Sequence, residues 1–266
     1  SDADLLHVAS QDLMSGVHIP EKPMVVTVHD IFPYLGYSGP IYSWMSKRYV
    51  DNIEKSADRV IAISEATKEQ LIQNTSLEPG KIDIVYQGVD LETFRPVEDD
   101  SKYDNYFLHV GHELDRKNID GVIAAFEKIK EKDTEAKLVR VGNIERTKKL
   151  LKDSDLILGE DIIHEEELDL DRLVNLYSNA RKLLFPSEGE GFGRPMIESL
   201  ACGTPVVAYD RKPMSEVLPE NMLTEWEDTE SFAHKALDEE SYDCRKITQE
   251  FTWERTAEQT KEVYRK

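Results

Sequence analysis

Glycines and glutamates alternate in one short segment, and their spacing suits a ligand that carries both hydroxyls and negative charge. Gly189, Gly191 and Gly193 precede a stretch that reads as a helix. Backbone N–H groups at a helix start form an anion site, and glycines let a ligand approach them closely. Glu190 and Glu198 flank this turn, and a carboxylate can accept the paired hydroxyls of a ribose or a hexose. We predict that both carboxylates face one pocket.

The flanks of this segment predict the elements that position it. Residues 182–185 read as a buried strand leading into the glycine loop. Pro195 suits the first turn of a helix, so we expect Glu198 in that first turn, and Gly203 suits the helix end. The next strand is expected at residues 205–209. In a parallel sheet such a loop lies at the carboxyl edge, where ligands bind.

The same alternation of strands and helices runs through most of the chain. Short β-branched runs with helical segments between them favour buried parallel sheets. Before the polar, proline-bearing stretch 95–102, which reads as a linker, the pattern predicts strands at 5–9, 24–28, 60–63 and 82–86 and a helix at 65–73 capped by Ser64. After it, the pattern predicts strands at 106–110 and 137–141, a helix at 119–129, and a helix striped by Leu168, Leu173, Leu176 and Tyr177. We predict an α/β fold with domains at residues 1–97 and 98–250 and a closing helix at 251–266.

Composition excludes several classes of protein. The 266 residues are 39% hydrophobic, which is enough for a packed core, and no apolar run approaches the ~18 residues of a membrane span. Fifty-three acidic residues against 33 basic ones give a net charge of −20, which disfavours nucleic acid as a partner. Cys202 and Cys244 form neither a disulfide framework nor a zinc site, so we expect a reduced, cytosolic interior.

Metal and dinucleotide sites are both disfavoured. The chain has three Asp-x-Asp pairs, a number close to what chance gives in so acidic a sequence. A G-x-G-x-x-G fingerprint begins at Gly189 and Gly191 but fails at Arg194. We therefore predict no bound metal and no prosthetic group.

The segment from Phe185 to Val207, FPSEGEGFGRPMIESLACGTPVV, resembles the signature of glycosyltransferase family 4, whose members are retaining enzymes of the GT-B fold. Further resemblances follow in the family's order and cover nearly all of the chain: VTVHD (26–30), AISEATKEQL (62–71), YQGVDLETFRP (86–96), HVGHELDRKN (109–118), LVNLYSNARKLLFPS (173–187) and FTWERTAEQTKEVY (251–264). In the family the last of these is a helix that crosses back onto the first domain.

The resemblance implies a fold and an activity. The fold would be two Rossmann-like domains whose parallel sheets face each other across a cleft. The activity would be transfer of a sugar, with retention, from a nucleotide-diphosphate sugar to a hydroxyl of a glycan, a lipid-linked or a small-molecule acceptor. The expected location is the cytoplasm, including the inner face of the membrane, and the oligomeric state stays open.

The resemblance also implies roles for residues on the glycine loop. Glu198 would accept the ribose hydroxyls of the nucleotide, and Glu190 would hold hydroxyls of the transferred sugar. Gly191 and the amides around Phe192 and Gly193 would face the sugar and the phosphates.

Outside that loop, Lys117, helped by Arg116, would neutralise the diphosphate as it leaves, and His29 would line the acceptor side. Gly111 and His112 would belong to the donor site. The family often carries an arginine where this chain has His112, so Arg116 would supply the lost charge. Cations at a helix start oppose the helix dipole, which also favours an anion beside this pair. By residue type alone, His29 is equally a structural histidine.

The N-terminal region departs from the family. A glycine-rich acceptor loop has no counterpart, and the start of the sequence reads as the entry to a middle strand. We expect an incomplete first domain and a missing N-terminal segment. Two other functions stay open: a nucleotide-sugar-binding fragment without transferase activity, and a related GT-B nucleotide-sugar epimerase.

Residues 32–48 are rich in aromatic side chains and end in Lys47 and Arg48. They read either as a packed loop and helix or as a patch that faces an acceptor or a membrane.

Overall fold

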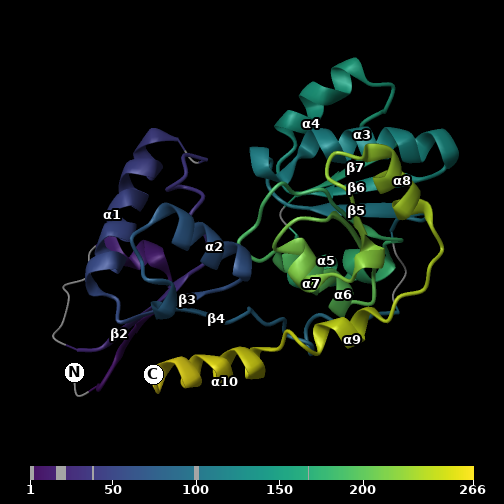
Figure 1. The fold of residues 1–266 in the computed structure, drawn as a ribbon. Helices are drawn as coiled ribbons and strands as arrows, with labels where there is room; N and C mark the ends of the chain where they lie inside the picture. Colours follow the sequence, from purple (N-terminus) through teal and green to yellow (C-terminus); the bar gives the residue numbers. More distant parts are fainter. Residues whose placement is uncertain (1–2, 16–21, 38, 99–101, 167) are drawn as a thin grey trace. The chain divides into compact units, whose positions relative to one another are not determined.

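The computed structural model describes residues 3–15, 22–37, 39–98, 102–166 and 168–266 of an α/β protein with two parallel sheets (Figure 1). The predicted linker 95–102 lies partly outside these residues. The chain divides into two compact units, which are described separately. The first comprises Ser1–Gly88, Glu190–Phe192 and Trp253–Lys266, and the second comprises Val89–Gly189 and Gly193–Thr252.

The first unit is built on a four-stranded sheet of order β1-β2-β3-β4, with every pairing parallel. Its strands are β1 (Leu6–Val8), β2 (Met24–Val28), β3 (Arg59–Ala62) and β4 (Ile82–Ile84). Its helices are α1 (Pro40–Ser56), α2 (Glu65–Asn74) and α10 (Trp253–Tyr264), with short 3₁₀ turns η1 (Gln11–Ser15) and η2 (Pro79–Lys81).

Strand alternation gives this sheet two apolar faces. Val26, Val28 and Val60 point to one face, where they share a buried cluster with Ile53 of α1 and Leu71 of α2. The intervening strand residues Val25 and Ile61 point the other way and, with Val85 just after β4, pack against Val263 of α10. Because successive side chains of a strand alternate in direction, a sheet covered on both faces needs buried residues at every position. Strand β2 meets that requirement, since all five of its residues are buried and four of them are apolar.

The second unit contains a six-stranded sheet of order β10-β9-β8-β5-β6-β7, again parallel throughout. Its strands are β5 (Tyr106–Val110), β6 (Lys137–Val141), β7 (Ile162–Glu165), β8 (Leu183–Phe185), β9 (Val206–Tyr209) and β10 (Leu223–Thr224). Its helices are α3 (Ile119–Lys132), α4 (Glu145–Leu150), α5 (Leu170–Asn179), α6 (Arg194–Ala201), α7 (Met214–Val217), α8 (Thr229–Leu237) and α9 (Cys244–Thr248), with 3₁₀ turns η3 (Asp115–Lys117), η4 (Leu151–Asp153) and η5 (Glu220–Met222).

Helices cover both faces of this second sheet. Helices α3 and α8 pack on one face through a large buried cluster that includes Phe107, Phe126, Leu138 and Phe232. Helices α5 and α6 lie on the opposite side of the sheet in Figure 1, and α6 contacts both β8 and β9. Within this unit the chain therefore follows the pattern predicted from its β-branched runs, with the glycine loop at the carboxyl end of a central strand.

Most predicted elements are confirmed, and the differences have local causes. Predicted strands 24–28, 106–110 and 137–141 agree with β2, β5 and β6, and Ser64 caps α2 as expected. Leu168 was assigned to a helix but lies before α5, because the Asp169 carboxylate accepts from Arg172 N at 2.8 Å and caps the helix there. The segment 40–56 is a helix, α1, with its N-cap at Gly39. Among the described residues, no helix is both long and apolar enough to cross a bilayer.

Candidate functional site

The glycine loop of the second unit ends at a helix start that only glycine accommodates easily. Gly193 is the N-cap of α6 and has a left-handed backbone with φ +93°. A residue with a side chain is strained at that φ, and glycine, which has no Cβ, adopts it without strain. Pro195 lies in the first turn, as predicted. Glu198 is the fifth residue of α6 and therefore lies in its second turn, which corrects the expected first-turn position.

The Glu198 carboxylate is held by two different partners. Tyr177 of α5 donates its hydroxyl to Glu198 Oε2 at 3.0 Å, and both residues are buried. Arg194, one turn earlier on α6, places its guanidinium 3.0 Å from Oε1 while 60% of its side chain stays exposed. One oxygen of Glu198 is thus fixed from the protein interior, and the other faces a partner that can move into solvent.

Burial sets the protonation of this pair. Burial raises the pKa of Glu198 above its ordinary value, and Arg194 and Tyr177 oppose that rise only in part. Burial, together with the nearby Glu198 charge, raises the pKa of Tyr177 well above its usual range. Tyr177 therefore keeps its proton and acts as the donor in this hydrogen bond.

Two predicted cations lie on a short turn that is bonded to the glycine loop. Arg116 and Lys117 belong to η3, just before α3. The Glu188 amide donates to the Arg116 carbonyl at 2.8 Å, and the Arg116 guanidinium donates to the Gly189 carbonyl at 3.1 Å. Lys117 is 91% buried, and its ammonium lies 5.4 Å from the centre of the Phe185 ring at the end of β8. The second unit thus brings both cations to the strand end where the loop begins.

A second glycine contact aligns the strand ends beside these cations. A methyl group on Gly142, after β6, would lie 2.4 Å from the Gly111 carbonyl oxygen after β5, so the two backbones touch. That same carbonyl accepts from the Arg140 guanidinium at 2.9 Å. A methyl group on Gly111 would lie 3.7 Å from the Lys117 side chain. His112, the next predicted donor residue, is exposed.

The most deeply buried charge of the second unit is one that sequence reasoning missed. Arg140 of β6 is fully buried and donates to His109 Nδ1 at 2.9 Å. Burial, then the charges of Arg140 and Lys117, lower the pKa of His109 well below its usual range, so its imidazole is neutral. Glu113 lies 3.6 Å from Arg140 and also accepts from the amides of Arg146 and Thr147. Burial alone would raise the pKa of Glu113, but these amide bonds and the Arg140 charge outweigh it and lower that pKa.

The tripeptide Glu190–Phe192 belongs to the first unit, where it packs at the ends of β2 and β3. A methyl group on Gly191 would lie 2.2 Å from the His29 carbonyl oxygen. The Ser64 hydroxyl donates to the Gly191 carbonyl at 2.5 Å. Ser64 Oγ also accepts from the Thr67 amide at 3.0 Å and so caps α2. The first unit therefore holds this part of the loop through backbone contacts that a larger residue at 191 would break.

His29 has a fixed ring. Its Nε2 lies 3.0 Å from the Ala9 carbonyl, and its Nδ1 lies 3.0 Å from the Gln87 amide nitrogen. Donation to the carbonyl and acceptance from the amide require the neutral tautomer with the proton on Nε2. The His29 amide donates to Gln11 Oε1 at 3.0 Å. With both nitrogens engaged, the orientation of the His29 ring is fixed.

The remaining predicted residues of the loop are buried. Glu190 is 95% buried, and the Phe192 ring lies 6.0 Å from the Tyr86 ring, both within the first unit. The structure thus brings His29, Glu190, Gly191 and Phe192 into the first unit. It brings Gly111, Lys117, Gly193 and Glu198 into the second, together with Arg116 and His112. That Glu190 and Glu198 share a pocket stays a prediction.

Several residues of these sites carried no sequence signal. The sequence predicted Tyr177 only as part of the apolar stripe of a helix. Arg194 was noted only because it breaks the glycine motif of dinucleotide-binding proteins. Arg140 lies between Val139 and Val141 in β6, and a charge within that apolar run is the one signal that could have identified it. Gln11 and Gln87 lie in loops with no motif. Among the described residues, no cluster of three or more His, Cys, Asp or Glu side chains is placed to hold a metal ion.

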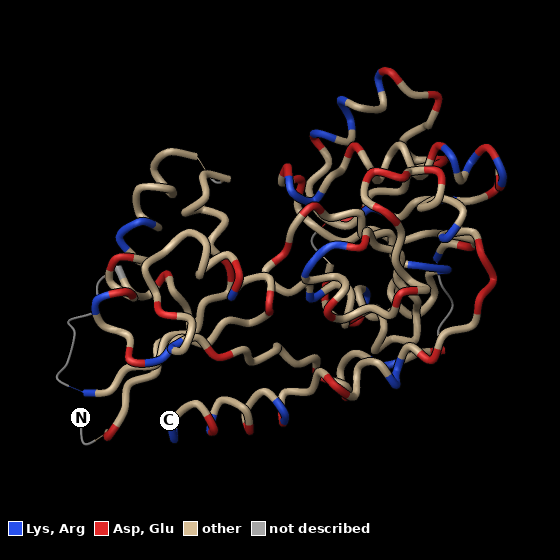
Figure 2. The backbone as a smooth tube through the Cα atoms, viewed as in Figure 1, with Lys and Arg blue, Asp and Glu red and all other residues tan. Residues whose placement is uncertain are grey.

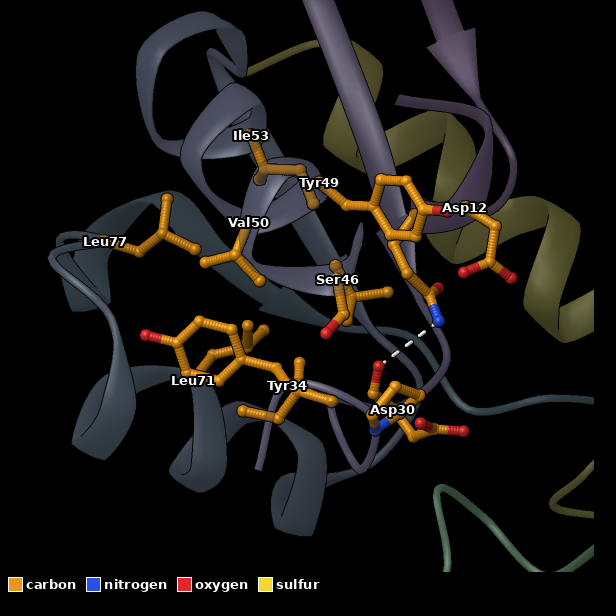
Figure 3. Close-up of a pocket in the computed structure, with 13 residues that line it drawn as sticks. Asp12, Asp30, Tyr34, Ser46, Tyr49, Val50, Ile53, Leu71 and Leu77 are labelled. Atoms are coloured by element: carbon orange, nitrogen blue, oxygen red, sulfur yellow. Dashed lines mark hydrogen bonds between the residues drawn. The ribbon is translucent and has the colours of Figure 1, made fainter. Parts of the chain in front are cut away.

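A small cavity lies beneath α1 in the first unit (Figure 3). Ser46, Val50 and Ile53 of α1 point into it, with Tyr34 and Leu71 opposite. Its volume is about 20 Å³, which is room for about one water molecule and not for a sugar. The Gln11 amide closes one side by donating to the Asp30 carbonyl at 3.2 Å.

Solved structures of similar fold place the chain in a known class. Sucrose-phosphate synthase of Thermosynechococcus elongatus superposes with a TM-score of 0.75 at 23% identity, over 98% of this chain and 73% of that one. HepE of Anabaena, crystallised with UDP-glucose, superposes with a TM-score of 0.78 at 16% identity, over 98% of this chain and 78% of that one. At these identities the likeness bears on the fold alone, and that fold is the GT-B class of α/β protein with two parallel sheets.

Family matches define the chain further. Residues 90–239 match the family described as glycosyl transferases group 1, and residues 1–93 match glycosyltransferase family 4. The chain therefore belongs to the group 1 glycosyl transferases.

Curated relatives agree with that membership. The O-antigen chain mannosyltransferase RfbU of Salmonella typhimurium is 29% identical over 203 residues, which is 76% of this chain and 56% of that protein. A Campylobacter jejuni enzyme is 32% identical over 179 residues, which is 64% of this chain and 46% of that protein. Its name describes 4-alpha-N-acetylgalactosaminyl transfer to a diacetylbacillosaminyl-diphospho-undecaprenol carrying N-acetylgalactosamine. The chain spans about half the length of these two relatives.

Proposed function

We propose that this protein is a retaining glycosyltransferase that moves a sugar from a nucleotide-diphosphate sugar to a hydroxyl acceptor. In the reaction the bond between the anomeric carbon and the phosphate oxygen breaks, and its electron pair leaves with the nucleoside diphosphate. The acceptor oxygen forms the new bond on the same face, and its proton passes to the departing diphosphate oxygen. The observation that carries the proposal is the η3 turn, where Arg116 is hydrogen-bonded to the glycine loop and Lys117 lies against Phe185 at the strand end where that loop begins.

Charge that develops on the leaving diphosphate is the main demand of this reaction. Fixed cations and oriented N–H groups stabilise such charge without reorganising during the step. Lys117, buried against Phe185, and Arg116 supply the cations, and the amides after Gly193 supply the N–H groups. Gly111 and His112 complete this diphosphate side. We assign the donor site to residues 98–250.

In this proposal the carboxylates of Glu198 and Glu190 accept hydrogen bonds from hydroxyls of the donor. Glu198 accepts from the ribose through the oxygen that Arg194 now contacts, while Tyr177 keeps the other oxygen in place. Glu190, with Gly191 and Phe192, faces the transferred sugar. His29 lines the acceptor side with its ring oriented by Ala9 and Gln87.

The relatives' names guide the choice of substrates. HepE was crystallised with UDP-glucose, RfbU is named a mannosyltransferase, and the Campylobacter jejuni enzyme is named for a lipid-linked acceptor. We propose a glycan or lipid-linked acceptor. Both cysteines are buried and neither is in a disulfide, which supports a reducing, cytoplasmic compartment.

The test begins with the donor. Thermal-shift measurements against UDP-, GDP-, ADP- and dTDP-sugars identify the nucleotide, because a ligand that binds the folded state raises the midpoint of unfolding. Kinetics then compare Lys117→Met and Arg116→Met with Lys149→Met, an exposed lysine on α4. We expect kcat/KM to fall roughly hundredfold or more for Lys117→Met and to stay unchanged for Lys149→Met. Equal activity in all three variants would remove the cations from the mechanism.

The same assay separates the other functions. Nucleotide-sugar binding without product, across a panel of glycan and lipid-linked acceptors, would indicate a binding fragment. A rearranged donor sugar formed without acceptor would indicate an epimerase.

A further inference from the structure

Large apolar side chains are exposed on helix α1 and just before it. Ile41 is 72% exposed, Tyr42 65% and Trp44 61%, and Tyr37 just before the helix is 58% exposed. Single exposed apolar residues are normal, but here four of them lie within eight positions of the sequence. These four residues, with Lys47 and Arg48, are called the α1 patch.

The helix has two apolar faces. Ser46, Val50 and Ile53 are buried and point into the cavity shown in Figure 3. Ile41 and Trp44 lie on the opposite side, because a helix turns 100° per residue. Arg48 is on that outer side too, with its guanidinium carbon 5.3 Å from the centre of the Trp44 ring. Burying the first face in the core therefore leaves the second without a cover among the described residues.

Charge distinguishes this stretch from the rest of the chain. The protein has 53 acidic residues in 266, yet residues 31–50 contain none and carry Lys47 and Arg48. In Figure 2 the first half of α1 shows blue but no red. A surface that only had to stay in water would have no reason to lose its carboxylates in so acidic a protein.

We propose that the α1 patch binds the surface of an anionic lipid bilayer. Tyrosine and tryptophan are enriched where a membrane meets water, because one end of the ring is apolar and the other is polar. Lysine and arginine are attracted to anionic headgroups, and carboxylates are repelled by them. The absence of acid, the exposed aromatic rings and the two cations fit that one partner. Helix α1 lies on the membrane in this proposal and does not cross it.

A second copy of the chain fits the patch less well. Four aromatic or aliphatic side chains of about 150–200 Å² each, exposed by some three fifths, offer ~450 Å². A stable dimer buries about 800 Å² on each partner. Two like patches would also bring their cations together.

The proposal goes beyond glycosyl transfer and does not depend on it, so the test uses no sugar nucleotide. The full chain is sedimented with vesicles of phosphatidylcholine and phosphatidylglycerol in equal parts, and with vesicles of phosphatidylcholine alone. The apolar variant is Ile41→Ser with Trp44→Ser, and the charge variant is Lys47→Glu with Arg48→Glu. Their matched controls are Trp253→Ser on α10, and Lys149→Glu with Lys152→Glu, all at exposed positions. Circular dichroism confirms that each variant is folded.

We expect binding to the anionic vesicles that weakens at least tenfold in both patch variants and is unchanged in both controls. The tryptophan emission should shift to the blue on binding, and the Trp44→Phe variant should lose that shift. Absence of binding, equal binding by patch and control variants, or equal binding to uncharged vesicles would overturn the proposal. So would a dimer in solution that the patch variants dissociate, because the occupant would then be a second copy.

Discussion

At the scale of single residues, the Glu198 carboxylate makes one contact with a buried residue and one with an exposed residue. The buried Tyr177 hydroxyl holds one oxygen, and the exposed Arg194 contacts the other. In the donor site that we propose, a ribose hydroxyl would replace Arg194 and leave the Tyr177 bond in place.

Glu198→Ala should weaken nucleotide binding. The ribose hydroxyls would lose a charged acceptor, and hydrogen bonds to charged groups are worth about 1.5–3 kcal/mol, or roughly 10- to 150-fold in affinity. Titration calorimetry with the nucleotide found by thermal shift measures the change. Glu131→Ala, on the exposed side of α3, serves as the control. If calorimetry gave the same affinity for both variants, Glu198 would have no part in the site.

Glu198→Gln should separate stability from binding. Because burial raises the pKa of Glu198, the folded protein binds this proton more tightly than the unfolded chain does. The contribution of Glu198 to the free energy of unfolding is then largest below the unfolded pKa and falls as the pH rises through the folded pKa. We expect the glutamine variant to lose this pH dependence and, at neutral pH, to be at least as stable as the parent while binding nucleotide less well.

Urea unfolding at mildly acidic and at neutral pH measures the difference. A variant that is less stable at neutral pH, and equal to the parent in acid, would mean that the ion pair with Arg194 outweighs the cost of burying the charge.

Arg140→Met should destabilise the second unit. The substitution leaves Glu113 without its buried countercharge and removes the donor to the Gly111 carbonyl. Removing one partner of a buried ion pair costs about 3–5 kcal/mol, and the amide bonds that Glu113 keeps should reduce this to ~2–4 kcal/mol. Denaturant unfolding gives the value. Adding Glu113→Gln should recover part of the loss, and a double variant no more stable than Arg140→Met would show that the pair is not coupled.

At the scale of elements, the loop after β8 depends on backbone contacts. Gly191→Ala would drive a methyl group to 2.2 Å from the His29 carbonyl, and backbone yields less than a side chain does. We expect a loss of about 1–3 kcal/mol in the free energy of unfolding, as for overpacked interiors. Gly80→Ala in η2 is the matched control, because a methyl group there meets nothing within 4 Å. Equal stability of the two variants would mean that the loop moves aside at little cost.

At the scale of the whole molecule, the reaction should retain the configuration of the anomeric carbon and continue in EDTA. In the proposed mechanism, Lys117 and Arg116 would take the place that a divalent cation has in metal-dependent transfer. Proton NMR of the first product formed, with and without chelator, tests both statements. An inverted product would contradict the proposed reaction, and a reaction stopped by EDTA would contradict the role given to the two cations.

The sequence predicted the sheets better than it predicted the site. Strands such as β2 and β5 are short runs in which four of the five residues are apolar, so local pattern alone defines them. Arg140 was missed because a charge in a strand normally points to water, and here only the fold brings His109 and Glu113 to it. The contact of Gly191 with His29 joins residues far apart in the chain. Such a contact leaves no trace in local sequence.

The Ser64 hydroxyl makes two hydrogen bonds in the first unit. Its oxygen accepts from the Thr67 amide and caps α2, and its hydrogen is donated to the Gly191 carbonyl. Hydrogen exchange at the Thr67 amide should therefore depend on whether the glycine loop stays bonded to Ser64. If the loop leaves the Ser64 hydroxyl, the cap loses its fixed orientation, and deuterium should enter the first turn of α2 more quickly. Isotope uptake at a single backbone position would follow the loop in solution with no label placed on the loop itself.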